Sequence, residues 1–349
     1  MPNIILQPDI QFKGEPHLEQ AVYGERYKVH TSESKNLGSI PDAVWSDAVA
    51  MVCYHEIEVT DAVLARMPNC RVVVRAGVGF DNIDLKAAGV RGIAVCNTPD
   101  YGTMDVADHA IAMTLALLRG LIAYNTAVLN DPVGGWRFQD ATTIRRLSTQ
   151  TFGVVGLGRI GTATALRAKA LGMKVIFYDP YRSTGTELAV GIGRVNSLTD
   201  LLEQSDIVSL HTPLTPDTHH LISVAELAAM KDDALLINTA RGGVLDLKAL
   251  SATLADGRLT GVGLDVLEQE PPSPDHPLLA LWRAPNSPIR HKLIVSPHAA
   301  FYSPSSLIDL RQKSARTAFE FLETSASRDQ VNLAFFDATA AARRKGAAA

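Results

Sequence analysis

The feature that most constrains the fold is a glycine-rich turn near the middle of the chain. The motif Gly156-Leu-Gly158-Arg-Ile-Gly161 follows an apolar run at 152–155 and precedes apolar residues at helical spacing. Such a strand–turn–helix unit lets the backbone approach a pyrophosphate and points a helix N-terminus at it. Asp179 ends the next β-rich run, where a carboxylate can accept hydrogen bonds from ribose hydroxyls. The unit predicts a dinucleotide-binding Rossmann domain.

The same carboxylate indicates which dinucleotide is bound. Asp179 would repel a 2′-phosphate, so NAD is expected rather than NADP. Arg182 is an opposing signal, with a solvated loop cation as its alternative interpretation. We expect the cofactor to contact the glycine-rich turn and the residues that end the following strands. These residues are Gly156, Gly158, Arg159, Ile160, Gly161, Asp179, His211, Thr212, Pro213, Thr239, Ala240 and Asp265.

The rest of the chain alternates in the same way. From Gly153 onward, short β-rich runs alternate with helical stretches, the pattern of a doubly wound parallel sheet in an α/β fold. The first hundred residues repeat the alternation on a smaller scale and predict a second lobe. A helical run at 305–323 is expected to return to that first lobe. The expected strands are 3–6, 50–53, 72–75, 94–96, 152–155, 174–178, 206–211, 234–238, 261–266 and 293–296.

Composition excludes several classes of partner. The 349 residues carry 33 basic and 37 acidic side chains mixed along the chain, without the basic stripe that nucleic acid requires. We find no leader-like N-terminus and no apolar run long enough for a membrane, so a cytoplasmic location is expected. Cys53, Cys70 and Cys96 form no ligand pattern, and the adjacent His219 and His220 lack the spacing of a zinc pair on one helical face. No metal is expected.

Three residues after later strands supply one kind of chemistry. Reduction of a 2-oxo acid by hydride transfer needs a proton donor, a cation for the carboxylate and carbonyl, and a group that tunes the donor. His298, Arg241 and Glu270 are of these types, and the carboxyl ends of parallel strands lie at one edge of a sheet. Taken singly, they are equally a core histidine, a helix-entry cation and a solvated loop acid.

The order of motifs resembles that of D-isomer-specific 2-hydroxyacid dehydrogenases, over residues 3 to about 332. The resemblance rests on GLGRIG at 156–161, INTARGGVLD at 237–246, GLDVLEQEPP at 263–272 and SPHAAFYS at 296–303. Within the family the chain is most similar to the branch of the C-terminal-binding proteins. That similarity rests on RAGVGFDNIDLKAAGVRGIAVCN at 75–97, LRAKALGMKVIFYDPY at 166–181 and HHLI at 219–222.

The resemblance implies an organisation in two Rossmann-like or flavodoxin-like lobes with a cleft between them. Residues 1–98 and 299–349 would form the substrate-binding lobe, and 99–298 the NAD-binding domain. The last residues, ATAAARRKGAAA, show no packed face and are expected to fray. A homodimer built on the cofactor lobe is implied, with residues 107–118 and the following arm as its interface. An ordinary core helix is the alternative for that stretch.

The resemblance also assigns roles to individual residues. Arg241, Glu270 and His298 become the catalytic trio, and Asp265 a partner of the nicotinamide amide. Backbone N–H groups of Val78 and Gly79 would hold the substrate carboxylate. The C-terminal-binding proteins have serine in place of Val78, threonine in place of Val106 and tryptophan in place of Phe301. The proline-rich segment 271–291 is longer here, and its prolines are expected to forbid a regular element.

The predicted function is NAD-dependent interconversion of a 2-oxo acid and a D-2-hydroxy acid, with His298 as general acid and base. Arg75 and Phe301 are expected to favour substrates with an apolar or aromatic tail over glyoxylate. The alternatives are that Phe301 packs a hinge and that Arg75 pairs with an acid such as Asp81. One alternative function is an NAD-sensing corepressor-like scaffold. Another is a different hydride donor, as in formate and phosphite dehydrogenases; Glu270 argues against the formate type.

Overall fold

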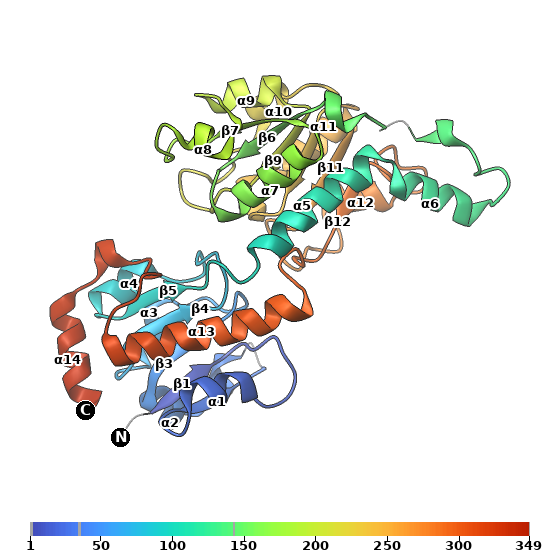
Figure 1. The fold of residues 1–349 in the computed structure, drawn as a ribbon. Coiled ribbons are helices and arrows are strands. Elements are labelled where there is room, and N and C mark those ends of the chain that lie inside the picture. The colour runs from blue at the N-terminus through green and yellow to red at the C-terminus, as the bar shows by residue number, and fades with distance from the viewer. Residues whose placement is uncertain (1–2, 34–35, 142–143, 349) are drawn as a thin grey trace. The chain divides into compact units, whose positions relative to one another are not determined.

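The computed structural model describes residues 3–33, 36–141 and 144–348 and divides into two units (Figure 1). Unit 1 comprises Met1–Gly102 and Ser303–Ala349, and unit 2 comprises Thr103–Tyr302. The chain therefore leaves unit 1 once and returns to it once. The predicted α/β class with two parallel-sheet lobes is confirmed.

Unit 1 is a five-stranded parallel sheet in the order β2-β1-β3-β4-β5. The strands are β1 (Ile4–Gln7), β2 (Lys28–Thr31), β3 (Ala48–Cys53), β4 (Val72–Arg75) and β5 (Ala94–Asn97). The helices are α1 (His17–Tyr23), α2 (Asp42–Asp47), α3 (Asp61–Ala65), α4 (Leu85–Val90), α13 (Pro304–Thr324) and α14 (Ala338–Ala348).

Successive residues of the central strands enter opposite cores, as the pleat requires. On β4, Val72 and Val74 pack in the cluster that contains α13, whereas Val73 packs with Trp45 and Leu64 on the other face. Both faces of the sheet are thus buried, which explains the continuous apolar runs in the sequence. The edge strand β2 was not predicted, because its residues Lys-Val-His-Thr are only partly buried and form no apolar run.

Unit 2 is a seven-stranded parallel sheet in the order β12-β11-β10-β9-β6-β7-β8. The strands are β6 (Thr151–Val155), β7 (Lys174–Tyr178), β8 (Gly193–Arg194), β9 (Ile207–Leu210), β10 (Leu235–Asn238), β11 (Gly261–Leu264) and β12 (Leu293–Val295). The helices are α5 (Thr103–Leu118), α6 (Leu121–Asn130), α7 (Arg159–Ala170), α8 (Thr186–Val190), α9 (Leu198–Gln204), α10 (Val224–Ala229), α11 (Leu247–Ala255) and α12 (Pro277–Arg283).

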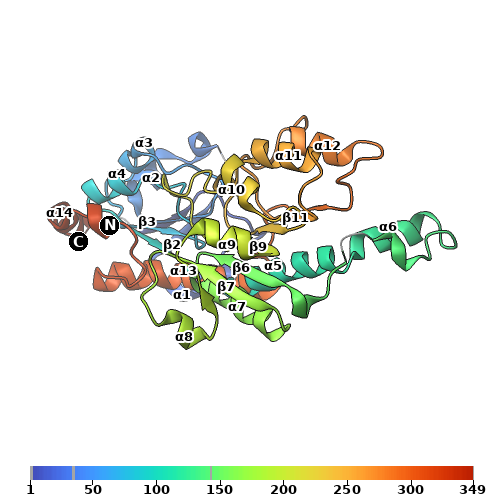
Figure 2. The same cartoon turned by 90° about the horizontal axis from the view of Figure 1, so that it is seen from above.

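The strand order of unit 2 reverses at β6, which lies between β7 and β9. In open α/β sheets ligands bind beyond the carboxyl ends of the strands at such a reversal. Figure 2 shows the same elements from above. The two-residue strand β8 was not predicted, because it is too short to give a periodic signal.

Helix α5 belongs to the core of unit 2. Its residues Ala110, Met113 and Leu117 pack with Phe152 and Leu235 of the sheet. Residues 107–118 therefore form an ordinary core helix of this unit, which was the alternative to a dimer interface. Within the described ranges, no single helix is long and apolar enough to cross a membrane. Helices α5 and α6 reach that length and hydropathy only as a pair, and the chain bends by 57° between them.

Two expectations about irregular segments are wrong. The proline-rich segment contains a regular element, α12, with Pro277 in its first turn and Leu278 buried. Proline is tolerated there, because the first N–H groups of a helix have no partner inside the helix. The tail expected to fray forms α14, whose Arg344 donates hydrogen bonds to the carbonyl oxygens of Met67, Pro68 and Cys70.

Candidate active site

The glycine-rich turn connects β6 to α7, as the sequence predicts. Gly156 has φ +90°, a conformation that favours glycine. A Cβ atom on Gly161 would lie 2.1 Å from the carbonyl oxygen of Gly156, so only glycine lets the helix pack this closely. Around Gly158 the space is open, since a Cβ atom there would meet only Arg182, at 3.8 Å. The turn is therefore shaped by its first and third glycines and leaves room at the second.

Asp179 follows β7 and faces the same turn. Its Oδ2 accepts a hydrogen bond from the Leu157 N–H at 2.8 Å, and its Oδ1 accepts one from Tyr181 N–H at 2.9 Å. The Arg182 guanidinium lies 3.6 Å from the same carboxylate. Each carboxylate oxygen accepts two hydrogen bonds, so Asp179 keeps acceptor capacity for a ribose.

Residues after β9 and β10 provide the next polar groups. The His211 ring nitrogen Nε2 lies 2.9 Å from Ser209 Oγ, and desolvation lowers the pKa of His211 to about 4, so the ring is neutral at pH 7. The hydroxyls of Thr212 and Thr239 are buried and have no hydrogen-bond partner among the described residues. Buried hydroxyls normally find partners, so these two fit contacts to a bound dinucleotide.

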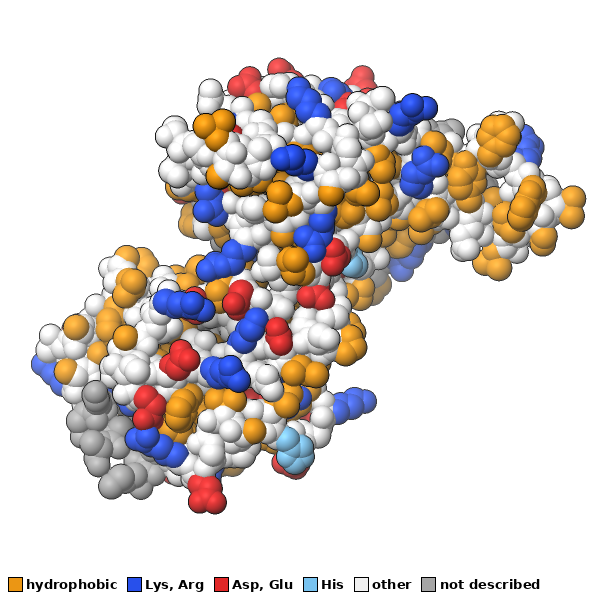
Figure 3. Space-filling model, in the orientation of Figure 1, with side chains coloured by type: hydrophobic (Ala, Val, Ile, Leu, Met, Phe, Trp, Pro, Cys, Tyr) orange, Lys and Arg blue, Asp and Glu red, His pale blue; other side chains and the backbone are white. Residues whose placement is uncertain are grey.

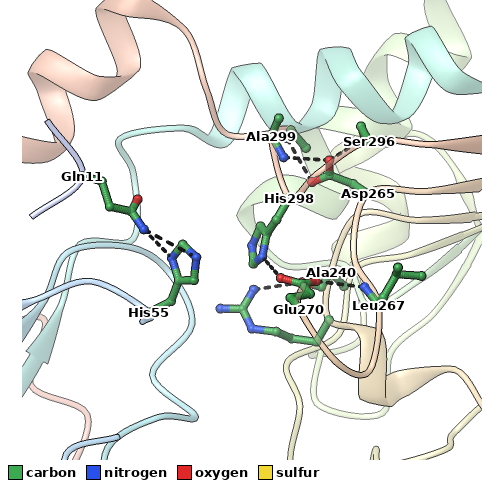
Figure 4. A network of polar contacts seen from close by, with 11 residues as sticks. Gln11, His55, Ala240, Asp265, Leu267, Glu270, Ser296, His298 and Ala299 are labelled. Atoms are coloured by element: carbon green, nitrogen blue, oxygen red, sulfur yellow. Dashed lines mark hydrogen bonds and ion pairs between the residues drawn. The ribbon is translucent and has the colours of Figure 1, made fainter. Parts of the chain in front are cut away.

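The predicted pair His298 and Glu270 is formed. His298 Nδ1 lies 2.6 Å from Glu270 Oε2, and the other carboxylate oxygen accepts the Leu267 N–H at 2.8 Å (Figure 4). The side chains are about one-fifth and one-third exposed, so the pair is shielded but reachable. Phe301 stands edge-on to the His298 ring, with 6.2 Å between centroids.

Arg241 follows β10, and Glu270 lies in the segment that follows the neighbouring strand β11. Its Nη1 donates to the Ala240 carbonyl at 2.9 Å, and the Asn238 amide holds the turn by donating to the Arg241 carbonyl at 2.9 Å. Arg241, Glu270 and His298 thus come from the same edge of the unit 2 sheet.

Asp265, predicted to contact the nicotinamide amide, lies at the end of β11 and is 2% exposed. Its carboxylate accepts hydrogen bonds from Ser296 Oγ at 2.5 Å, Ala299 N–H at 2.8 Å and Ala300 N–H at 2.9 Å. About four acceptor positions exist on a carboxylate, so most are already used by the protein. The contact to nicotinamide stays a prediction, and holding the turn around His298 is a role that the sequence did not reveal.

The predicted substrate residues of unit 1 follow β4. Arg75 is 5% exposed and donates from Nη1 to the Ala76 carbonyl at 2.9 Å. The N–H groups of Val78 and Gly79 donate to no acceptor within the described part of the chain, so a carboxylate could bind there. These placements leave the predicted substrate contacts open to test.

Sequence reasoning missed a polar group at the same sheet edge of unit 1. Buried Asp9 accepts hydrogen bonds from the Tyr54 and Glu56 N–H groups, at 2.9 and 3.2 Å. Burial raises the pKa of Asp9 to about 6, although the nearby charge of Arg75 opposes this. Between these two backbone donors stands His55, whose Nδ1 is 3.2 Å from Gln11 Nε2. The only signal was the pattern of polar residues after β1 and β3.

A doubly wound sheet, a glycine turn shaped for a pyrophosphate and a nearby histidine–carboxylate pair define a nicotinamide-dependent dehydrogenase. Residues 111–300 match the family model described as D-isomer specific 2-hydroxyacid dehydrogenase, NAD binding domain. The chain is 37% identical to the glyoxylate reductase of Korarchaeum cryptofilum (strain OPF8) over 302 residues, 86% of each protein. The chain belongs to the D-isomer-specific 2-hydroxyacid dehydrogenase family.

Other relatives agree with this assignment. The D-3-phosphoglycerate dehydrogenase of Methanocaldococcus jannaschii is 41% identical over 235 residues, 67% of this chain and 44% of that protein. The crystal structure of D-lactate dehydrogenase from Aquifex aeolicus, complexed with NAD and lactic acid, has a TM-score of 0.75 and 30% identity. It covers 92% of this chain and 96% of that one.

The family confirms two predictions made from the sequence. The chain is an NAD-dependent D-2-hydroxyacid dehydrogenase, and NAD is its cofactor. The finer similarity to C-terminal-binding proteins stays a prediction, because the relatives above carry the names of metabolic enzymes. Those names support the enzyme over the scaffold alternative.

Proposed function

We propose that the enzyme reduces a 2-oxo acid to a D-2-hydroxy acid, with His298 as the general acid. The observation that carries the proposal is the 2.6 Å contact between His298 Nδ1 and Glu270 Oε2. An ionised carboxylate only accepts hydrogen bonds, so Nδ1 carries a proton and donates to Glu270. The other ring nitrogen, Nε2, is then the atom that exchanges a proton with the substrate oxygen. Glu270 fixes the orientation of the ring.

The remaining residues of unit 2 complete the proposed chemistry. The planar guanidinium of Arg241 can hold the substrate carboxylate and polarise the carbonyl. NAD, when bound in its reduced form, supplies the hydride. The turn at 156–161, Asp179 and the hydroxyls of Thr212 and Thr239 would hold it.

We propose NADH rather than NADPH as the working cofactor, because Asp179 faces the turn with acceptor capacity for a ribose. Asp179→Asn removes the charge but keeps one acceptor oxygen, whereas Asp179→Ala removes the charge and both acceptor oxygens. We expect kcat/KM for NADPH to rise about tenfold or more in Asp179→Asn, since Arg182 would then face the 2′-phosphate without a competing carboxylate. The kcat/KM for NADH should fall further in Asp179→Ala than in Asp179→Asn. Equal kcat/KM for the two cofactors in the unmodified enzyme would contradict this proposal.

For the substrate, we propose a 2-oxo acid with an apolar or aromatic tail. The support is Phe301, whose ring stands edge-on beside His298 and offers an apolar surface next to the proposed proton donor. Burying each additional methylene contributes about 0.8 kcal/mol. The opposing indication is the name of the Korarchaeum relative, a reductase of glyoxylate, which has no tail.

A substrate panel tests the proposed function and its specificity together. The oxidation of NADH would be followed with glyoxylate, hydroxypyruvate, 2-oxo-4-methylpentanoate and phenylpyruvate. Two or three extra methylenes should favour the larger acids by about ten- to a hundredfold in kcat/KM. Phe301→Ala should remove most of that preference while leaving glyoxylate nearly unchanged. A tenfold preference for glyoxylate or hydroxypyruvate over both larger acids would show that the enzyme is a small-substrate reductase.

We also propose a homodimer, formed through the arm of unit 2 that contains α6 and the loop after it. Leu129, Val133, Trp136 and Phe138 are between 76% and 87% exposed. Figure 3 shows hydrophobic side chains gathered on this arm. Exposed apolar side chains in such a concentration mark an interaction surface.

The mass in solution tests the dimer. We expect light scattering to give two chains for the unmodified enzyme and one chain for the double variant Leu129→Glu with Trp136→Glu, because two buried charges would oppose association. Leu188→Glu is the matched control, since Leu188 on α8 is 83% exposed and lies outside the arm. A double variant that keeps the mass of two chains would place the interface elsewhere.

A further inference from the structure

A histidine outside the predicted site is connected to the turn that carries His298. His109 lies on α5, within unit 2, and its Nε2 is 2.9 Å from Ser296 Oγ and 3.8 Å from Asp265 Oδ1. The Ser296 hydroxyl is itself 2.5 Å from the same carboxylate oxygen. Three polar side chains from one helix and the ends of two strands therefore meet beside the turn that carries His298.

The hydrogen bonds of this group have one direction. Asp265, as a carboxylate, only accepts, so the single hydroxyl proton of Ser296 points to Asp265. The oxygen of Ser296 is then left as an acceptor, and the N–H of His109 Nε2 is its donor. A chain runs from His109 through Ser296 to Asp265, in which each hydrogen bond polarises the next.

Asp265 fixes the backbone at His298 and directly after it. Ala299 and Ala300 donate their N–H groups to Asp265, and the N–H of His298 donates to the Asp265 carbonyl at 2.7 Å. Figure 4 shows Asp265 between Ser296 and Ala299. His298 has φ +52°, a left-handed conformation that costs energy in a residue other than glycine. The surrounding hydrogen bonds hold the turn in this conformation.

We propose that His109 is a positioning residue, which fixes His298 through Ser296 and Asp265. The inference rests on the proposed role of His298 as general acid. Without the donor at position 109, the Ser296 oxygen loses the hydrogen bond that ties it to α5, so the Ser296–Asp265 contact and the turn around His298 are held less firmly. A displacement of about 1 Å in a reacting group can cost up to a hundredfold in rate.

Two substitutions of His109 separate the donor from the bulk of the ring. The amide nitrogen of glutamine reaches about as far as Nε2 and can donate to Ser296, whereas leucine cannot. We expect His109→Leu to lower kcat about tenfold with a 2-oxo acid from the panel above, with the Kd for NADH within about twofold. His109→Gln should keep at least about half of the unmodified kcat. His291→Leu, at an exposed histidine of unit 2, is the matched control.

A third variant tests the connection itself. Ser296→Ala removes the hydroxyl that joins His109 to Asp265, and we expect the same loss of kcat as in His109→Leu. The double variant should be no slower than either single variant, because both remove one chain of hydrogen bonds. Thermal unfolding of each variant shows whether the fold is kept.

An unchanged kcat in His109→Leu would overturn the proposal, and so would a His109→Gln variant as slow as His109→Leu. Additive losses in the double variant would also contradict it. Failure of the proposed function looks different, because His298→Asn would then remain active. An inactive His298→Asn together with a fully active His109→Leu would reject the role of His109 alone.

Discussion

The His298→Asn variant is expected to lose between about a hundred- and ten-thousandfold of the reductase rate while binding NADH almost as tightly as the unmodified enzyme. The range is the usual contribution of general acid catalysis. Asparagine can still donate to Glu270 from a position near that of Nδ1, so the local hydrogen bond survives while the proton donor at Nε2 is lost. Steady-state kcat with the best acid of the panel, and fluorescence titration of NADH, measure the two effects separately.

The matched control is His220→Asn. His220 is another histidine of unit 2 that lies beside a carboxylate, with 3.2 Å between its Nε2 and Glu268 Oε1. A nearly unchanged rate in this variant shows that losing a histidine–carboxylate pair is not harmful in itself. If His298→Asn keeps more than about half of the activity, another group is the acid and the proposed mechanism is wrong.

Gly158→Ala is expected to abolish tight binding of NADH without disturbing the fold. A Cβ atom at this position meets no protein atom closer than 3.8 Å, so the protein itself accommodates alanine. It would instead occupy the space in which the pyrophosphate approaches the backbone. We expect the Kd for NADH to rise about a hundredfold, which corresponds to about 3 kcal/mol, with Tm unchanged within about 2 °C.

Gly161→Ala provides the contrast. Its Cβ atom would lie 2.1 Å from the carbonyl oxygen of Gly156, so β6 and α7 must move apart. Such overpacking typically costs about 1–3 kcal/mol, and each kcal/mol lowers Tm by about 2–4 °C in a domain of this size. NADH binding and Tm should therefore fall together. A Gly158→Ala variant that binds NADH normally would show that the pyrophosphate lies elsewhere.

Local sequence determined the features that depend on neighbouring residues. The strand–turn–helix unit at 156–161 is one of these, because both the strand and the glycine turn are encoded within ten residues. Strands buried on both faces, such as β4, were also predicted, since both faces select apolar side chains. The motif order placed Arg241, Glu270 and His298 at strand ends, and parallel strands bring such ends to one edge.

Other features were decided by contacts between distant residues. Strands β2 and β8 gave no apolar pattern, because the side chains of β2 are only partly buried and β8 has only two residues. The C-terminal helix α14 contains little that predicts packing, yet Arg344 binds carbonyl groups more than 270 positions away.

The positions of Asp265 and His109 show the same limit within the site. A strand-end aspartate and a histidine on a core helix have no spacing relation to Ser296 in the sequence. Their hydrogen bonds exist only because α5 packs against β11, which brings residues 109, 265 and 296 together. The sequence by itself determined which residues can carry the chemistry, whereas the tertiary structure decided which residues hold them in place, because hydrogen-bond geometry depends on distances that local patterns do not encode.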